Sequence, residues 1–218
     1  MYELKAFSVT DKYGNLYFDT SFRDGERVVE KRVEPKKLAE ILLGSVKDEV
    51  KFLPVPTNLP ECVKIARMAT DGCQDSFEVV MVFPEKKRGF SYMGNPLFIP
   101  FPALVMKVSF VRGIKREGCI WALDTDEPNG DSVVYHYPFG NVGGSGSICF
   151  GNIKLKVDTI ADAPRVFEEF ILGATNNDLY RHQNTKGLEQ GELIKIIETS
   201  DEYPKELLLA TGLKFGNL

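Results

Sequence analysis

Residues 103–137 read ALVMKVSFVRGIKREGCIWALDTDEPNGDSVVYHY and contain three runs dominated by apolar residues. Clusters of glycine, proline and charged residues separate the runs and are typical of turns. Because these turns are short, each run should pair with the next one in an antiparallel sheet. A further run, FEVVMVF at 77–83, comes before PEKKRG at 84–89 and a proline-interrupted segment at 95–102. The region predicts a four-stranded antiparallel meander in which PEKKRG is a turn.

Helical patterns follow these strands. Asp162 can cap a helix through PRVFEEFILG (164–173), in which the apolar residues share one wide face. A second helix is predicted in EYPKELLLATG (202–212), which has proline in its first turn and glycine after its last. Strands followed by helices indicate an α+β fold.

The N-terminal part has a pattern of its own. Residues 1–33 contain three strand-like segments of alternating polarity, and 35–44 predict a short helix. The segment FLPVPTNLP at 52–60 has three prolines in nine residues, so we expect no regular structure there. We therefore expect an N-terminal β/α extension over residues 1–52, rich in β structure, and a main domain over residues 60–218.

Composition narrows the classes of function. The 218 residues are 43% hydrophobic and 27% charged, which is typical of a globular protein. A net charge of −4 gives no general electrostatic attraction to nucleic acid or to anionic membrane. No export signal or membrane-spanning run is recognisable, so we expect a cytoplasmic protein with reduced thiols. The four cysteines form no CxxC pair, and the two histidines lie 46 residues apart, so no metal site is expected.

One stretch, YHYPFGNVGGSGSICFGN at 135–152, carries residues suited to catalysis. Asn141 and Cys149 are joined by a glycine-rich segment whose backbone can run close to a reacting centre. The flanking Ile148 and Phe150 can anchor the backbone by packing while the sulfur faces the loop. A thiol is a nucleophile, and a side-chain amide beside it is a candidate oxyanion donor.

Two simpler interpretations apply to the same features. A free cysteine is commonly a small core residue, and we expect that role for Cys62, Cys73 and Cys119. For Cys149 the interval to Asn141 favours a functional role. The glycine-rich loop could instead hold a phosphate, but it lacks the Gly-Lys-Ser/Thr ending and no clear helix follows it at once.

The run NVGGSGSICF resembles the active-site stretch of ubiquitin-conjugating enzymes, in which a His-Pro-Asn motif precedes Gly-Ser-Ile-Cys by the same interval. Phe139 and Gly140 occupy the positions of the histidine and proline, so the asparagine of that motif is retained alone. Residues 95–155 are more similar to the prokaryotic ubiquitin-conjugating-enzyme-like family D, including protein B of PRTRC cassettes. Its members carry Pro-Phe-x-Asn-Val and then Gly-x-x-Cys-x-Gly. The resemblance implies a helix, a four-stranded antiparallel meander, an extended active-site loop and C-terminal helices.

The resemblance also implies roles for individual residues. Cys149 would accept the C-terminal carboxylate of a ubiquitin-like protein as a thioester. Asn141 would stabilise the oxyanion formed when a lysine amine attacks. His182 and Asp178 lie roughly where conjugating enzymes place a residue that helps to deprotonate the lysine, although either can also be a solvated loop residue.

The implied partners are an activating-enzyme-like adenylyltransferase, a ubiquitin-like protein and a JAB-type isopeptidase from the same gene cluster. The resemblance implies no cofactor, because ATP is used by the activating partner. A non-catalytic module of the same fold that binds a ubiquitin-like tail is the alternative function. A thiol hydrolase is a third, but it needs a base beside the sulfur. The presence of both Cys149 and Asn141 favours catalysis.

Overall fold

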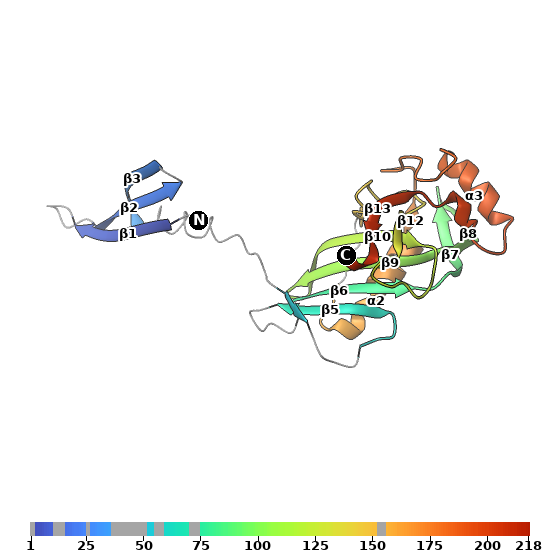
Figure 1. The fold of residues 1–218 in the computed structure, drawn as a ribbon, viewed down its shortest axis with the longest axis horizontal. Helices are drawn as coiled ribbons and strands as arrows, with labels where there is room; N and C mark the ends of the chain where they lie inside the picture. The colour runs from blue at the N-terminus through green and yellow to red at the C-terminus, as the bar shows by residue number, and fades with distance from the viewer. Residues whose placement is uncertain are drawn as a thin grey trace. The chain divides into compact units, whose positions relative to one another are not determined.

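The computed structural model describes residues 3–10, 16–24, 27–35, 52–54, 59–69, 75–151 and 156–218. The chain forms two compact units, Met1–Val50 and Lys51–Leu218. The described strands of the first unit pair antiparallel in chain order (Figure 1): β1 (Glu3–Thr10), β2 (Leu16–Asp24) and β3 (Arg27–Val33). Apart from Pro35, the helix expected over 35–44 lies outside the described residues.

In the described part of the second unit, the strands expected for the four-stranded meander lie side by side within a larger, seven-stranded sheet. Neighbouring strands are antiparallel, in the order β13-β11-β10-β9-β6-β5-β4. The strands are β4 (Phe52–Pro54), β5 (Val63–Ala69), β6 (Phe77–Phe83), β9 (Ala103–Val111), β10 (Ile114–Leu123), β11 (Val133–His136) and β13 (Ala210–Lys214).

The expectation of no regular structure over 52–60 was wrong at its first residues. Phe52–Pro54 pairs with Arg67–Ala69 of β5. This strand forms one edge of the sheet. An edge strand tolerates proline, because the missing backbone N–H can face away from the ladder.

The segment PEKKRG (84–89) is largely a strand rather than the predicted turn. It leads into β7 (Lys86–Tyr92), which pairs with β8 (Asn95–Phe101) in a hairpin. The two-residue turn, Met93–Gly94, has positive φ at both positions, as a tight hairpin of this kind requires. The hairpin and β12 (Ala174–Thr175) form a separate sheet in the order β12-β7-β8. Figure 1 shows the hairpin beside helix α3 (Gln190–Glu198).

Helix α2 (Pro164–Leu172) confirms the helix predicted over 164–173, and Phe167 and Phe170 are buried as its apolar face requires. The ring of Phe167 stacks on Phe83 of β6 with centroids 3.6 Å apart. The predicted cap was wrong. Asp162 ends a short 3-10 helix, η1 (Ile160–Asp162), and its carboxylate accepts a hydrogen bond from Thr159 instead.

The helix predicted over 202–212 was also wrong. Its residues form a 3-10 turn, η2 (Lys205–Leu207), and then β13, whose pairing with β11 outweighs the local helical preference. Sequence reasoning missed α3, which begins with a capping box between Glu189 and Glu192. A last 3-10 turn, η3, spans Phe215–Asn217. Of the helices in the described ranges, none is both long and apolar enough to cross a bilayer.

Both faces of the main sheet are covered. In β6, Val79 and Met81 join the larger core cluster, which includes α2 and α3 residues. Val80 and Val82 join a smaller cluster with Trp121. Successive strand residues point to opposite faces, so this division follows from the period of two. Residues of the continuous apolar run FEVVMVF therefore pack into two core clusters, one on each face of the sheet.

Candidate active site

The glycine-rich segment folds back on itself so that Asn141 and Cys149 lie side by side. The backbone carbonyl of Asn141 accepts a hydrogen bond from the Cys149 N–H at 2.8 Å. Val142 and Ile148 form the next bridge, and the N–H of Gly143 donates to the carbonyl of Ser147 at 2.8 Å. The eight-residue interval seen in the sequence is thus the length of this tight loop.

Strand β10 holds the loop in place. The N–H of Ile148 donates to the carbonyl of Gly118 at 2.9 Å, and the N–H of Ile120 donates to the carbonyl of Gly146 at 2.8 Å. Gly146 is buried with φ +88°, and a Cβ at this position would overlap the indole nitrogen of Trp121. Glycine is therefore required at this position, where the loop packs against Trp121.

Cys149 is exposed, whereas its neighbours Ile148 and Phe150 are half-buried and pack against the larger core cluster. This arrangement anchors the backbone and leaves the thiol accessible. The cysteine lines a pocket of about 380 Å³. The other residues around this pocket are Asn141, Phe150, Gly151, Phe170, Gly173, Ala174, Asn176 and Asp178.

Asn141 connects the loop to the opposite side of the pocket. Its side-chain amide donates to the carbonyl of Ala174 at 2.9 Å, and its backbone N–H donates to the carbonyl of Asp178 at 2.7 Å. The residue has φ +64°, a conformation in which asparagine is enriched among non-glycine residues. A side-chain amide has two N–H donors, so the bond to Ala174 leaves one for a substrate oxygen.

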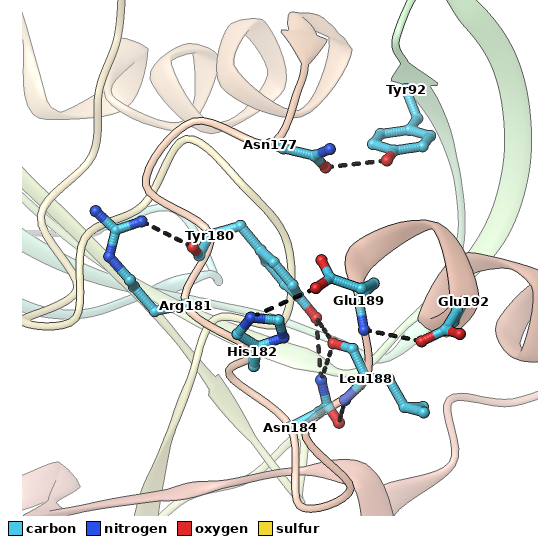
Figure 2. A network of polar contacts seen from close by, with 9 residues as sticks. All are labelled: Tyr92, Asn177, Tyr180, Arg181, His182, Asn184, Leu188, Glu189 and Glu192. Atoms are coloured by element: carbon cyan, nitrogen blue, oxygen red, sulfur yellow. Dashed lines mark hydrogen bonds and ion pairs between the residues drawn. The ribbon is translucent and has the colours of Figure 1, made fainter.

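Of the two predicted bases, Asp178 lies at the pocket and His182 does not line it. The Asp178 carboxylate accepts a hydrogen bond from the Asn176 amide at 2.9 Å. Its backbone N–H donates to the Asn176 side-chain oxygen at 2.7 Å. Figure 2 shows His182 facing Glu189, with Nε2 3.6 Å from a carboxylate oxygen. The structure therefore groups Cys149 and Asn141 with Asp178.

Lys115 is a charged neighbour of Cys149 that sequence reasoning missed. It lies in β10, and its Nζ is 3.1 Å from the ring centroid of Phe150. Burial lowers the pKa of Lys115 to about 8, while interaction with the charge of Cys149 acts in the opposite direction. The segment RGIKREG (112–118) looked like a turn, and nothing in it indicates a partner so far along the chain.

Cys62, Cys119 and His136 are less accessible than Cys149. Burial raises the pKa of the Cys62 and Cys119 thiols, which makes them weak nucleophiles near neutral pH. Cys73 lies outside the described residues. His136 is half-buried in β11, and burial lowers its pKa. In the part of the chain that the structure describes, no three His, Cys, Asp or Glu side chains gather as metal ligands would.

The chain belongs to prokaryotic E2 family D, whose model matches residues 74–210. E2 denotes the ubiquitin-conjugating-enzyme class, so the match confirms the resemblance seen in the loop sequence. The matched region contains Asn141, Cys149, Asp178 and His182. Comparisons with curated proteins and with solved structures gave no match.

Proposed function

We propose that this chain is a transferase that carries a ubiquitin-like protein as a thioester on Cys149 and passes it to an amine or another nucleophile. One observation carries the proposal: the exposed Cys149 lines the same pocket as Asn141 and Asp178. A nucleophile, an oxyanion donor and a proton acceptor are the groups that acyl transfer through a thiol uses. Membership of E2 family D supports a ubiquitin-like protein as the acyl group.

Two acyl transfers make up the proposed cycle. In loading, the Cys149 thiolate attacks the thioester that joins the ubiquitin-like protein to the activating enzyme, and the activating enzyme's sulfur leaves. In discharge, an amine attacks the new thioester, a C–N bond forms and the C–S bond to Cys149 breaks. The free N–H of the Asn141 amide would donate to the carbonyl oxygen as it gains negative charge.

Asp178 is the better candidate for the group that takes the proton from the attacking amine. The residue lines the pocket, and its carboxylate is oriented by Asn176. His182 faces Glu189, and that contact uses the imidazole Nε2. A general base must reach the proton that it removes, so position decides between the two residues.

The proposed partners are an activating-enzyme-like adenylyltransferase, a ubiquitin-like protein and a JAB-type isopeptidase from the same gene cluster. The first two provide the test. Incubation with both proteins and ATP should give an adduct that thiols remove and that peptide mapping places on Cys149. Cys149→Ser should give at most a slower, thiol-resistant ester.

Cys119→Ala is the matched control, because Cys119 is half-buried and does not line the pocket. This variant should load normally. An adduct that forms equally well on Cys149→Ala would rule out the assignment. Binding of the ubiquitin-like protein without any adduct would instead support the non-catalytic module.

A further inference from the structure

The fold places the amine of Lys115 beside the pocket that contains Cys149. Its Nζ lies over the ring of Phe150, which directly follows the cysteine and lines the same pocket. Gly118 lies close against this ring, and Phe170 meets it edge-on with centroids 5.9 Å apart. The amine therefore rests on a ring that is held from two sides and that belongs to the residue directly after the cysteine.

We propose that Lys115 is an internal acceptor, to which the acyl group on Cys149 is transferred within one molecule. The inference rests on the proposed function, because the ubiquitin-like protein would be the acyl group in the cell. Lysine has a flexible four-carbon stem, so its amine can leave the Phe150 ring and reach the neighbouring carbonyl. The product carries a thiol-stable isopeptide bond on Lys115.

The transfer balances without any further reactant. The neutral Lys115 amine attacks the thioester carbonyl, and a C–N bond forms as the C–S bond breaks. Cys149 leaves as a thiolate and takes up the proton that the nitrogen loses. The thiol is then free to be loaded again.

The surroundings of Lys115 increase the fraction of neutral amine, which is the form that this attack needs. With a pKa of about 8, roughly a tenth of the amine is neutral at pH 7, against about one part in 2,500 for an ordinary lysine.

Lys156 offers a matched comparison. Its amine pairs with Asp158 at 2.6 Å, and the contact raises its pKa. Ile114, the neighbour of Lys115, forms a bridge with Lys156. Lys156 is therefore an exposed lysine of the same region, with a raised instead of a lowered pKa, against which Lys115 can be compared.

A chemical acyl donor tests the transfer on the full chain. p-Nitrophenyl acetate should acetylate Cys149 with release of p-nitrophenolate, after which thiol-sensitive acetyl should decline as Nε-acetyl on Lys115 rises. Peptide mapping by mass spectrometry follows both sites. Acetylation of Lys115 should be at least tenfold slower in Cys149→Ala, while that of Lys156 stays unchanged. Lys115→Arg, which keeps the cation over Phe150, should prolong the thioester at least fivefold.

Other outcomes overturn the inference. These are equal acetylation of Lys115 in wild type and Cys149→Ala, loss of the thioester by hydrolysis alone, or no acetyl on Cys149. Lys115→Gln is a second variant that also removes the lysine amine. Thermal melting of both variants shows whether either of them has a folding defect. The donor requires no ubiquitin-like protein. A negative result with p-nitrophenyl acetate therefore does not contradict the proposed function. A failure of enzymatic loading likewise does not contradict acetyl transfer from Cys149 to Lys115.

Discussion

The two sides of the Cys149 pocket are held in different ways. The loop wall, formed by Asn141 and residues 149–151, is held near β10 by backbone hydrogen bonds of the adjoining Gly146 and Ile148. The polar wall, residues 173–178, follows α2 and pairs with β7 through β12. Tyr92 donates to the Asn177 side chain at 2.9 Å across that junction (Figure 2).

The difference separates two tasks. A backbone-fixed wall suits a nucleophile whose position must not vary, and a wall of exposed polar side chains suits groups that adjust to an incoming amine. Asn141 belongs to the first wall but bonds to Ala174 and Asp178 of the second. Asn141 is therefore a candidate oxyanion donor and also links the two walls by hydrogen bonds, a structural role that we call the clasp. Mutations should separate these two roles.

The largest effect is expected beneath the two walls, at Phe170. Its ring is 5% exposed and contacts both Phe150 and Tyr137. Phe170→Ala should lower the free energy of unfolding by roughly 3–5 kcal/mol in chemical denaturation. Leu172→Ala, on the same helix but 70% exposed, should change it by less than about 0.5 kcal/mol. Similar losses in the two variants would mean that α2 does not support the pocket as described.

Asn141 tests whether the clasp is also a donor. Asn141→Gly keeps the positive φ without strain and removes the amide, so discharge of a preloaded thioester to free lysine should slow by about 10²–10³, or roughly 3–4 kcal/mol. Asn141→Asp should be no better, because it puts negative charge where negative charge develops. Single-turnover discharge, after the activating enzyme is removed, measures the effect.

Thermal melting of the same variants separates the two roles of Asn141. Unchanged discharge in Asn141→Gly would remove the catalytic role. Slow discharge together with a large loss of stability would indicate that the residue acts mainly as the clasp.

The sequence predicted the loop wall well because its determinants are local. The interval from Asn141 to Cys149 and the glycines between them specify a tight loop, and the family motif lies wholly within it. The helix over 164–173 was equally readable from its apolar face. Each of these features depends on neighbours within a few residues.

The polar wall and Lys115 depend on pairings between distant segments. β12 forms because Ala174 pairs with Ser91 of β7. The charged run KKR at the start of β7 had indicated a turn rather than a strand. β13 follows from pairing with β11, which overrode a helical pattern. Lys115 reaches Phe150 only after β10 and the loop are placed together. The periodicity of apolar residues shows only which face of a local segment is buried, so it does not reveal contacts between distant segments.

A smaller effect should separate the two predicted bases, Asp178 in the polar wall and His182 outside it. Asp178→Asn keeps the backbone carbonyl that binds Asn141, so it isolates the carboxylate. Discharge to lysine should slow by about 10²-fold, in the usual range for loss of general-base catalysis. His182→Ala should stay within about twofold, because His182 faces Glu189 and does not line the pocket. The reverse ranking, in single-turnover assays at pH 7, would reassign the base.

The smallest effect concerns the pH dependence of transfer to Lys115, which contacts Phe150 of the loop wall. Because burial lowers the pKa of this amine to about 8, its neutral fraction rises with pH and is nearly complete by pH 9. The rate of acetyl transfer from Cys149 to Lys115 should therefore rise about tenfold between pH 7 and 9 and then level off. An exposed lysine of ordinary pKa would gain about a hundredfold over the same range without levelling. Site-specific mass spectrometry distinguishes the two curves, and a hundredfold rise at Lys115 would show that the Phe150 site does not hold the amine in a desolvated state. Lys156, whose pKa is raised by Asp158, should follow the steep curve in the same samples.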